Sequence, residues 1–285
     1  MYLLKKGFTK EVADKHTKEK ERFENWLKEE RQTLKQIGYS DILTYTGVWR
    51  KHGNKVITMN KKLTALRHYF TYLMGEKRLV HNPALGISLQ GTLRTVPYNL
   101  LEEEELQDLF TRYPQETLLQ IREKAMLGLF VFQGITVKEL EQLREENVDL
   151  SKGTIYIPST RRTNSRKLKL ESGQILLMYQ YLKEVRPKLL KGCTEAIENL
   201  FFTTYFNQDL GNVLLRILSH LKLVNTKVKD FIHIRNSVIT LWLKRENLRL
   251  VQYKAGHRFA SSTERYKTNS LEELKNLLEE FHPLG

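Results

Sequence analysis

Cysteine is almost absent from this chain of 285 residues, which contains only Cys193. A single cysteine excludes a disulfide framework and a zinc site built on several cysteines. Long apolar runs are absent too, since none approaches the roughly 20 residues that span a bilayer. The first residues, MYLLKKGFTKEVADKH, lack the apolar stretch of a secretory signal peptide. We therefore expect a cytoplasmic protein without structural disulfides.

Acidic residues are outnumbered by basic ones. The chain has 47 Lys and Arg against 33 Asp and Glu, which gives a formal net charge of +14. A surplus of this size suits a polyanionic partner, either a nucleic acid or an anionic membrane surface. Because no segment could span a membrane, nucleic acid is favoured. The sequence also lacks an HExxH motif, a Cys/His ligand set and a P-loop, so we expect no metal ion and no nucleotide cofactor.

The first 90 residues predict a bundle of helices. The segment SDILTYTGVWRKHG begins at Ser40, a residue type that caps helices, and it ends at Gly53. In TMNKKLTALRHYFTYLMGEKRL the apolar residues recur at helical spacing, namely Leu63, Leu66, Phe70 and Leu73. Lys62 and Arg67 lie off this stripe. They belong either to a solvated face or to a face that contacts phosphate groups.

A short linker separates the bundle from a second domain. Residues 91–98 contain glycine, threonine and proline without periodicity, so we place the domains at 1–90 and 99–285. In the second domain GTIYIP and RKLKLE alternate in polarity and predict a β-hairpin joined by STRRTNS. Thr136 and Glu139 predict a capping box. The remainder is helical, so the predicted fold is mostly α with a small β-hairpin. The segment SLEELKNLLEEF predicts an amphipathic helix that could dock on its own domain or on a neighbour.

Tyr266, near the end of the chain, has a candidate chemical role. A tyrosine hydroxyl with a pKa near ~10 is a poor nucleophile at neutral pH. Cations beside it favour the phenolate and stabilise the charge that develops on a phosphoryl group. Arg235, His257 and the hairpin arginines Arg161 and Arg162 could supply that environment. Taken singly, each residue also has a simpler interpretation: a packed tyrosine, an arginine paired with an acid, a histidine in a turn, and solvated hairpin arginines.

The order of these residues resembles the C-terminal signature of the tyrosine recombinases, the phage integrase family. That family has an H-x-L-R-H-T element, then an LGH element, then a tyrosine nine residues after that histidine. Here IRNS places Arg235 at the arginine, AGH places His257 at the histidine, and STERY places Tyr266 at the nucleophile. LTALRHYFTYLMGEKRLVHNPA resembles the end of the family's N-terminal DNA-clamping domain. STRRTNSRKLKL stands where the family has a basic β-hairpin.

The chain departs from the family pattern at two catalytic positions. Thr136, in the element GIT, occupies the position of the family's first arginine, and Ile232 that of its first histidine. His233 is one residue too close to Arg235 and would point roughly 200° away around a helix. We therefore do not assign His233 to the site. Lys138, close to Thr136 on the same predicted helix, is a local candidate for the missing cation.

The hairpin carries a third departure. The family's general-acid lysine aligns with Arg162 or with its neighbour Arg161. Arginine is a poor proton donor because it stays charged. We therefore expect Arg162 to reach toward the leaving oxygen or the minor groove beside it. Lys167 and Lys169, further along the second strand, are weaker substitutes.

The resemblance implies site-specific recombination of duplex DNA without a metal or nucleotide cofactor. Tyr266 would form a 3′-phosphotyrosyl link while Arg235, His257 and Arg162 act on the scissile phosphate. A helical N-terminal domain and an α+β catalytic domain would form a clamp around the duplex. Arg161, Lys62 and Arg67 would contribute to DNA binding.

The resemblance also implies how the protein assembles. The C-terminal helix would join protomers into a homotetramer on DNA in the nucleoid, with or without accessory DNA-bending proteins. Two alternatives remain open. One is a recombinase-derived DNA-binding protein that no longer cuts, and the other is a basic helical scaffold. The scaffold explains the net charge but not the ordered C-terminal signature.

Overall fold

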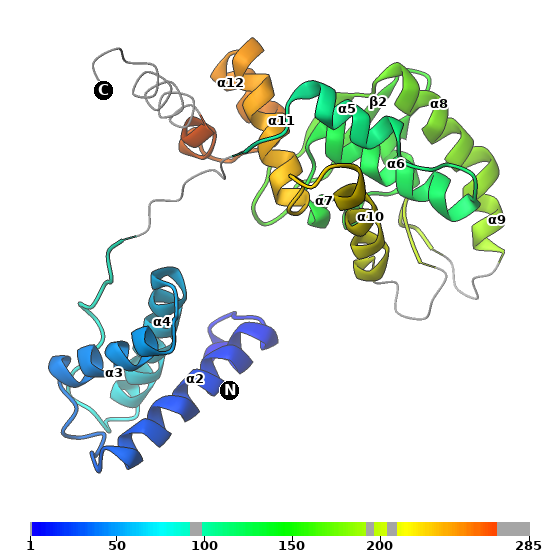
Figure 1. Cartoon of the computed structure of the whole chain (residues 1–285). Coiled ribbons are helices and arrows are strands. Elements are labelled where there is room, and N and C mark those ends of the chain that lie inside the picture. Colours follow the sequence, from blue (N-terminus) through cyan, green and yellow to red (C-terminus); the bar gives the residue numbers. More distant parts are fainter. Residues whose placement is uncertain (1, 92–98, 192–196, 204–209, 267–285) are drawn as a thin grey trace, which may run out of the picture. The chain divides into compact units, whose positions relative to one another are not determined.

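The computed structural model describes residues 2–91, 99–191, 197–203 and 210–266, and we refer only to these below. The chain divides into two units, Met1–Arg94 and Thr95–Gly285 (Figure 1). Each unit has a hydrophobic core of its own. The predicted linker, 91–98, and the predicted C-terminal helix, 270–281, lie almost wholly outside the described residues.

The N-terminal unit is the predicted helical bundle. Its helices are α1 (Tyr2–Lys5), α2 (Lys10–Glu29), α3 (Tyr39–Lys51) and α4 (Val56–Gly75). The apolar stripe predicted on α4 is buried, namely Leu63, Leu66, Phe70 and Leu73. Aromatic rings from three helices meet beside it, because the Phe23 ring lies 5.1 Å from Tyr45 and 5.5 Å from Phe70. Edge-to-face packing of this kind adds to the stabilisation from burial.

The start of α3 differs from the prediction, because Ser40 does not cap it. The helix begins one residue earlier, at Tyr39, and Gly38 is its N-cap. The Asp41 carboxylate accepts a hydrogen bond from the Gly38 N–H at 2.8 Å, which satisfies that end of the helix. Gly53 does end the segment, with a φ of +68°. Glycine adopts this left-handed conformation without strain.

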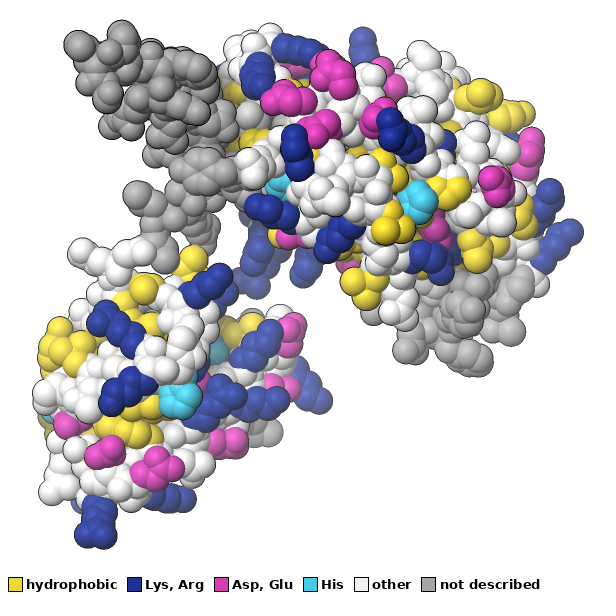
Figure 2. Space-filling model, viewed as in Figure 1, with side chains coloured by type: hydrophobic (Ala, Val, Ile, Leu, Met, Phe, Trp, Pro, Cys, Tyr) yellow, Lys and Arg dark blue, Asp and Glu magenta, His cyan; other side chains and the backbone are white. Residues whose placement is uncertain are grey.

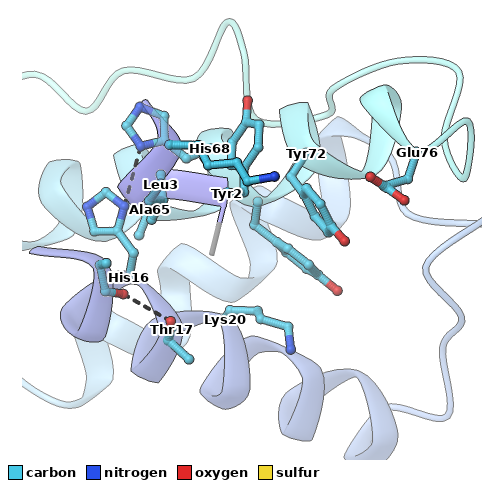
Figure 3. A pocket seen from close by; sticks show the side chains of 12 residues that line it. Tyr2, Leu3, His16, Thr17, Lys20, Ala65, His68, Tyr72 and Glu76 are labelled. Atoms are coloured by element: carbon cyan, nitrogen blue, oxygen red, sulfur yellow. Dashed lines mark hydrogen bonds between the residues drawn. The ribbon is translucent and has the colours of Figure 1, made fainter. Parts of the chain in front are cut away.

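The N-terminal unit contains a pocket of about 530 Å³ lined by α1, α2 and α4. Figure 3 shows His16 and His68 side by side at one end of it, with tyrosine rings at the other. One histidine donates to the other between their Nδ1 atoms, which are 3.4 Å apart. Burial lowers the pKa of both rings, and the positive charge of neighbouring groups lowers it further. Both histidines are therefore neutral at pH 7.

The second unit is built around α6 (Leu118–Gln133), most of whose residues are buried. Apolar residues lie on nearly every side of this helix, which is the pattern of a helix at the centre of a domain. It packs against α5, α8, α10 and α11. The other helices are α5 (Glu103–Thr111), α7 (Val137–Gln142), α8 (Ser172–Gln180), α9 (Arg186–Leu190), α10 (Gly211–Val224), α11 (Phe231–Arg245) and α12 (Leu248–Ala255), with short 3₁₀ and π segments at Glu145–Asn147 and Tyr181–Val185.

The predicted β-hairpin is confirmed. Strands β2 (Thr154–Ile157) and β3 (Arg166–Lys169) pair antiparallel, and the short β1 (Val148–Asp149) extends the sheet in the order β1-β2-β3. Ile157 pairs with Arg166, and Ile155 with Leu168. Alternate residues of a strand point to opposite faces. Arg166 therefore shares the buried face of β3 with Leu168. The fold is mostly helical with a small sheet, as predicted. Among the described residues, no helix is long and apolar enough to cross a membrane.

Candidate active site

Arg235 is fixed between the ends of two other helices. It lies in the first half of α11, whose N-cap residue Asp230 accepts a hydrogen bond from the His233 N–H at 2.7 Å. The Arg235 side chain is almost fully buried. Its guanidinium donates to the Gly134 carbonyl, just after α6, and to the Ala255 carbonyl at the end of α12 at 2.6 Å. These contacts hold a positive charge in one place inside the unit.

A buried ion pair stands beside Arg235. The Arg166 guanidinium binds Glu139 at 2.5 Å and 3.3 Å, and both side chains are fully buried. Arg166 also donates to the Lys254 carbonyl at 2.7 Å. The Glu139 carboxylate lies 3.9 Å from Arg235. Burial alone would raise the pKa of Glu139, but the hydrogen bonds and charge of Arg166, together with the charge of Arg235, lower it to about 2.

Arg166 did not emerge from the sequence analysis as a site residue. The strand pattern RKLKLE contained a signal, because Arg166 occupies the same face as the two buried leucines. A buried arginine requires an acidic partner. That partner, Glu139, lies on α7 and becomes apparent only in the fold.

Thr136 serves as a helix cap, as predicted. Its hydroxyl accepts from the Glu139 N–H at 3.2 Å, and its own N–H and hydroxyl donate to the Glu139 carboxylate at 2.7 Å and 3.0 Å. The position that holds an arginine in the resemblance is thus used to start α7. Lys138 is exposed, and Glu139 rather than Lys138 faces Arg235.

His257 follows the sharp turn that ends α12. The turn is made by Gly256, whose φ is +67°, and a Cβ at this position would overlap the Arg166 guanidinium. The His257 Nδ1 atom and the hydroxyl of the fully buried Thr263 share a hydrogen bond of 2.8 Å. Burial lowers the pKa of His257 to about 4, and the charges of Arg235, Arg265 and Arg166 add to the effect. The imidazole is therefore neutral at pH 7.

Tyr266 lies against His257. The two rings are nearly parallel, with an angle of 16° and centroids 6.0 Å apart. The Tyr266 hydroxyl donates to Asn236 Oδ1 at 3.0 Å, and only 8% of the residue is exposed. Burial raises the pKa of Tyr266, while the charges of Arg235 and Arg265 lower it. The structure thus brings Tyr266, Arg235 and His257 together from separate parts of the sequence.

The hairpin loop is attached to this cluster through its backbone. The Asn164 N–H donates to the Gly256 carbonyl at 2.8 Å, and Thr163 and His257 form a β-bridge. Arg161 and Arg162 are exposed at the tip of the loop, so their side chains are not part of the buried cluster. Lys167 and Lys169 are exposed along β3.

Ile232 and His233, at the start of α11, differ in their exposure to solvent. Ile232, where the resemblance would place a histidine, is 67% exposed. His233 is buried, and its Nε2 atom donates to the Asn99 carbonyl at 2.9 Å. His233 therefore contacts the segment that precedes α5, in keeping with its exclusion from the site by helical spacing.

Lys62 and Arg67 make contacts within the N-terminal bundle. The Lys62 ammonium lies 5.3 Å from the centre of the Trp49 ring and 3.8 Å from the Glu19 carboxylate. Arg67 donates to the backbone carbonyls of Ala84, at 3.0 Å, and Ile87. Arg67 thus fastens the segment that follows α4, while Lys62 partly neutralises a buried acid.

Comparison with known proteins decides the family. Residues 99–273 match the phage integrase family, and residues 3–77 match the N-terminal SAM-like domain of phage integrases. The chain belongs to the phage integrase family. As a tyrosine recombinase it is similar to the recombinase XerD of Haemophilus influenzae, with 25% identity over 100% of the chain and 96% of the relative. It is also 28% identical to XerC of Bacillus pumilus, over 88% of the chain and 83% of that protein.

Solved structures of other integrases share the fold of this one. The recombinase XerH bound to its difH substrate aligns with a TM-score of 0.64 at 21% identity, over 86% of this chain and 70% of XerH. A lambda integrase dimer bound to a core site aligns with a TM-score of 0.62 at 14% identity, over 92% of this chain and 93% of the integrase chain.

The lowered pKa of His257 predicts a pH-dependent stability of this integrase. The folded state resists protonation of His257 until about pH 4, whereas the unfolded chain takes up a proton near pH 6.5. The stabilisation is therefore complete above pH 6.5 and is lost as the pH falls toward 4. After allowance for partial exposure we expect a loss of roughly 2 kcal/mol across this window. Calorimetric melting temperatures of wild type and His257→Gln measure it.

His257→Gln should show a smaller fall in melting temperature between these pH values than the wild type. His52→Gln, at an exposed position in the N-terminal unit, is the matched control and should keep the wild-type dependence. Equal slopes for His257→Gln and wild type would contradict the assignment of a buried neutral imidazole.

Proposed function

We propose that this tyrosine recombinase cleaves and rejoins duplex DNA at a specific site through Tyr266. The phenol oxygen attacks the scissile phosphorus, the bond from phosphorus to the 5′ oxygen breaks, and a 3′-phosphotyrosyl link forms. The ring of His257 is unprotonated at rest, and the negative charge of a bound phosphodiester would raise its low pKa so that it can accept the phenol proton. The departing 5′ oxygen takes a proton from solvent. The 5′-hydroxyl of a partner strand then reverses the step. The observation that carries the proposal is the cluster of Tyr266, His257 and Arg235.

Arg235 can bind the phosphate without leaving its place. Its guanidinium uses two N–H groups for the carbonyls of Gly134 and Ala255. It also lies 3.9 Å from the Glu139 carboxylate, and we propose that the N–H groups of the fork that do not face these partners bind phosphate oxygens. Because Arg235 is already buried and oriented, little reorganisation is needed when charge develops at phosphorus. Arg162, at the hairpin tip, would reach the leaving oxygen or the adjacent minor groove.

The site has fewer phosphate-binding groups than the family pattern provides. Thr136 is a cap rather than a cation, and Ile232 is exposed and apolar. Loss of one donor to a developing oxyanion costs on the order of 10²–10³ in rate. We therefore propose an enzyme whose cleavage step is slow unless a partner protomer or an accessory protein supplies a further cation.

DNA binding by both units completes the proposal. Lys and Arg side chains are spread over the visible face of each unit (Figure 2). We propose that the two units form a clamp around the duplex, with Arg161, Lys62 and Arg67 near phosphate groups and the C-terminal helix joining protomers in a tetramer in the nucleoid. The DNA-bound structures of XerH and lambda integrase support the DNA-binding part of this proposal.

A second candidate function is that of a DNA-binding protein derived from a recombinase. The buried hydroxyl of Tyr266 favours it, because a nucleophile bonded to Asn236 must be released before it can attack. The substituted positions Thr136 and Ile232 favour it as well. Retention of Tyr266, Arg235 and His257 in one cluster favours the enzyme.

Covalent trapping separates the two functions. With a nicked suicide duplex that carries the core site, the wild type should form a gel-stable adduct and Tyr266→Phe should form none. Tyr266→Phe should still bind the duplex within a few fold, since one oxygen is removed with little change in packing. Tyr179→Phe, at an exposed tyrosine of α8, is the matched control. An adduct formed by Tyr266→Phe would identify another nucleophile.

The clamp predicts binding that depends on salt. Contact with ~6 or more phosphates would weaken duplex affinity by orders of magnitude between ~50 and ~200 mM salt. Titration by fluorescence anisotropy measures the slope. A flat response would argue against a clamp, and deletion of residues 1–90 should weaken binding strongly.

Substitution at Thr136 tests whether the site lacks a cation. Thr136→Arg should restore a charged hydrogen bond to phosphate of ~1.5–3 kcal/mol, or roughly ten- to a hundredfold in cleavage rate. Because loss of the cap alone costs ~1 kcal/mol of stability, Thr136→Ala is the reference. The measurement is the single-turnover rate of adduct formation. A rate for Thr136→Arg at or below that of Thr136→Ala would mean that another basic residue already fills the space.

A further inference from the structure

The side chain that touches the nucleophile in this structure is Asn236. It directly follows Arg235 on α11, is 8% exposed, and accepts the hydrogen bond of the Tyr266 hydroxyl on Oδ1 at 3.0 Å. The proposed roles of Arg235 and His257 concern the phosphate and the proton. Neither explains why a buried amide lies against the attacking oxygen.

The backbone on both sides of Asn236 is fixed. Arg235 is anchored to the ends of α6 and α12. Ser237 is fully buried, and its hydroxyl donates to the His233 carbonyl at 3.0 Å and accepts from the Leu101 N–H at 2.9 Å. Asn236 is thus held on a rigid turn of helix, so the position of its amide is set before any substrate arrives.

An asparagine amide can serve the tyrosine oxygen in two protonation states. Its oxygen accepts from the neutral phenol, as in this structure. Its nitrogen is a donor of nearly the same size and shape, and half a turn of the terminal amide exchanges the two. A phenolate has no proton to donate and needs a donor. Hydrogen bonding to the charged form favours that form.

Resting on the proposed recombinase function, we propose that Asn236 is a catalytic residue that holds Tyr266 through its amide oxygen at rest and donates an amide N–H to the Tyr266 oxygen as it gains charge. The proton that leaves Tyr266 passes to His257 as described above, so Asn236 gains and loses none. Asn236 thereby supplies one donor to the reacting oxygen in a site that has few donors.

The experiment uses the full chain on the nicked suicide duplex and follows the single-turnover rate of adduct formation from about pH 6 to pH 10. Asn236→Asp keeps the acceptor and the shape but removes the donor and adds a negative charge. We expect its rate to fall by roughly 10²-fold and its pH profile to shift upward by about one unit. A more acidic fluorinated tyrosine at position 266 should restore Asn236→Asp more than it accelerates the wild type.

Asn199→Asp, at an exposed position, controls for the added charge. If Asn236→Asp fails to bind the duplex, Asn236→Leu is tested instead, because leucine fits a buried site and offers neither donor nor acceptor. This variant should cleave at least tenfold more slowly than the wild type. The inference is overturned if the Asn236 variants cleave at rates within threefold of wild type. It is also overturned if the rate of Asn236→Asp falls without a shift of its pH profile and without recovery by the fluorinated tyrosine. A wild type that forms no adduct refutes the recombinase function itself.

Discussion

The ion pair between Glu139 and Arg166 is the interaction on which the rest of the site depends. The Glu139 carboxylate accepts a hydrogen bond from the N–H of Thr136, the residue that caps α7. The Arg166 guanidinium, on β3, donates to the Lys254 carbonyl in the last turn of α12. Arg235 of α11 lies 3.9 Å from the same carboxylate. Four elements therefore meet at one pair of charges. A buried charge that loses its partner costs ~3–5 kcal/mol, so the geometry of the site and the stability of the unit are not separable.

The charges around this pair set the resting state of the two titratable groups. His257 is kept neutral because it is buried among arginines, while the same arginines oppose the effect of burial on Tyr266. A phosphodiester bound here would bring a negative charge to a region that holds several positive ones. That charge would favour a protonated imidazole, so substrate binding and the capacity of His257 to hold a proton are coupled.

The sequence predicted those features of the fold and site that depend on neighbouring residues or on the order of motifs along the chain. The capping box at Thr136, the β-hairpin and the exclusion of His233 each follow from spacing within a few residues. The roles of Arg166 and Asn236 could not be reached in this way, because their partners lie 27 and 30 positions away and depend on how α7, β3 and α11 pack. The contacts of Lys62 and Arg67 within their own unit likewise depend on how its helices pack. Ser40 shows a local limit, because α3 has Gly38 as its N-cap and the Asp41 carboxylate binds the Gly38 N–H.

The hairpin loop is joined to the active site through its own backbone groups at Thr160, Thr163 and Asn164, which contact Arg258, His257 and Gly256. The position of the loop therefore does not depend on which side chains occupy its tip. Residues 161 and 162, exposed at the tip, can therefore be substituted without moving His257. Gly256 has no such freedom, because any larger residue would displace the Arg166 guanidinium. The same attachment thus tolerates side-chain changes at the tip of the loop and opposes them at the turn.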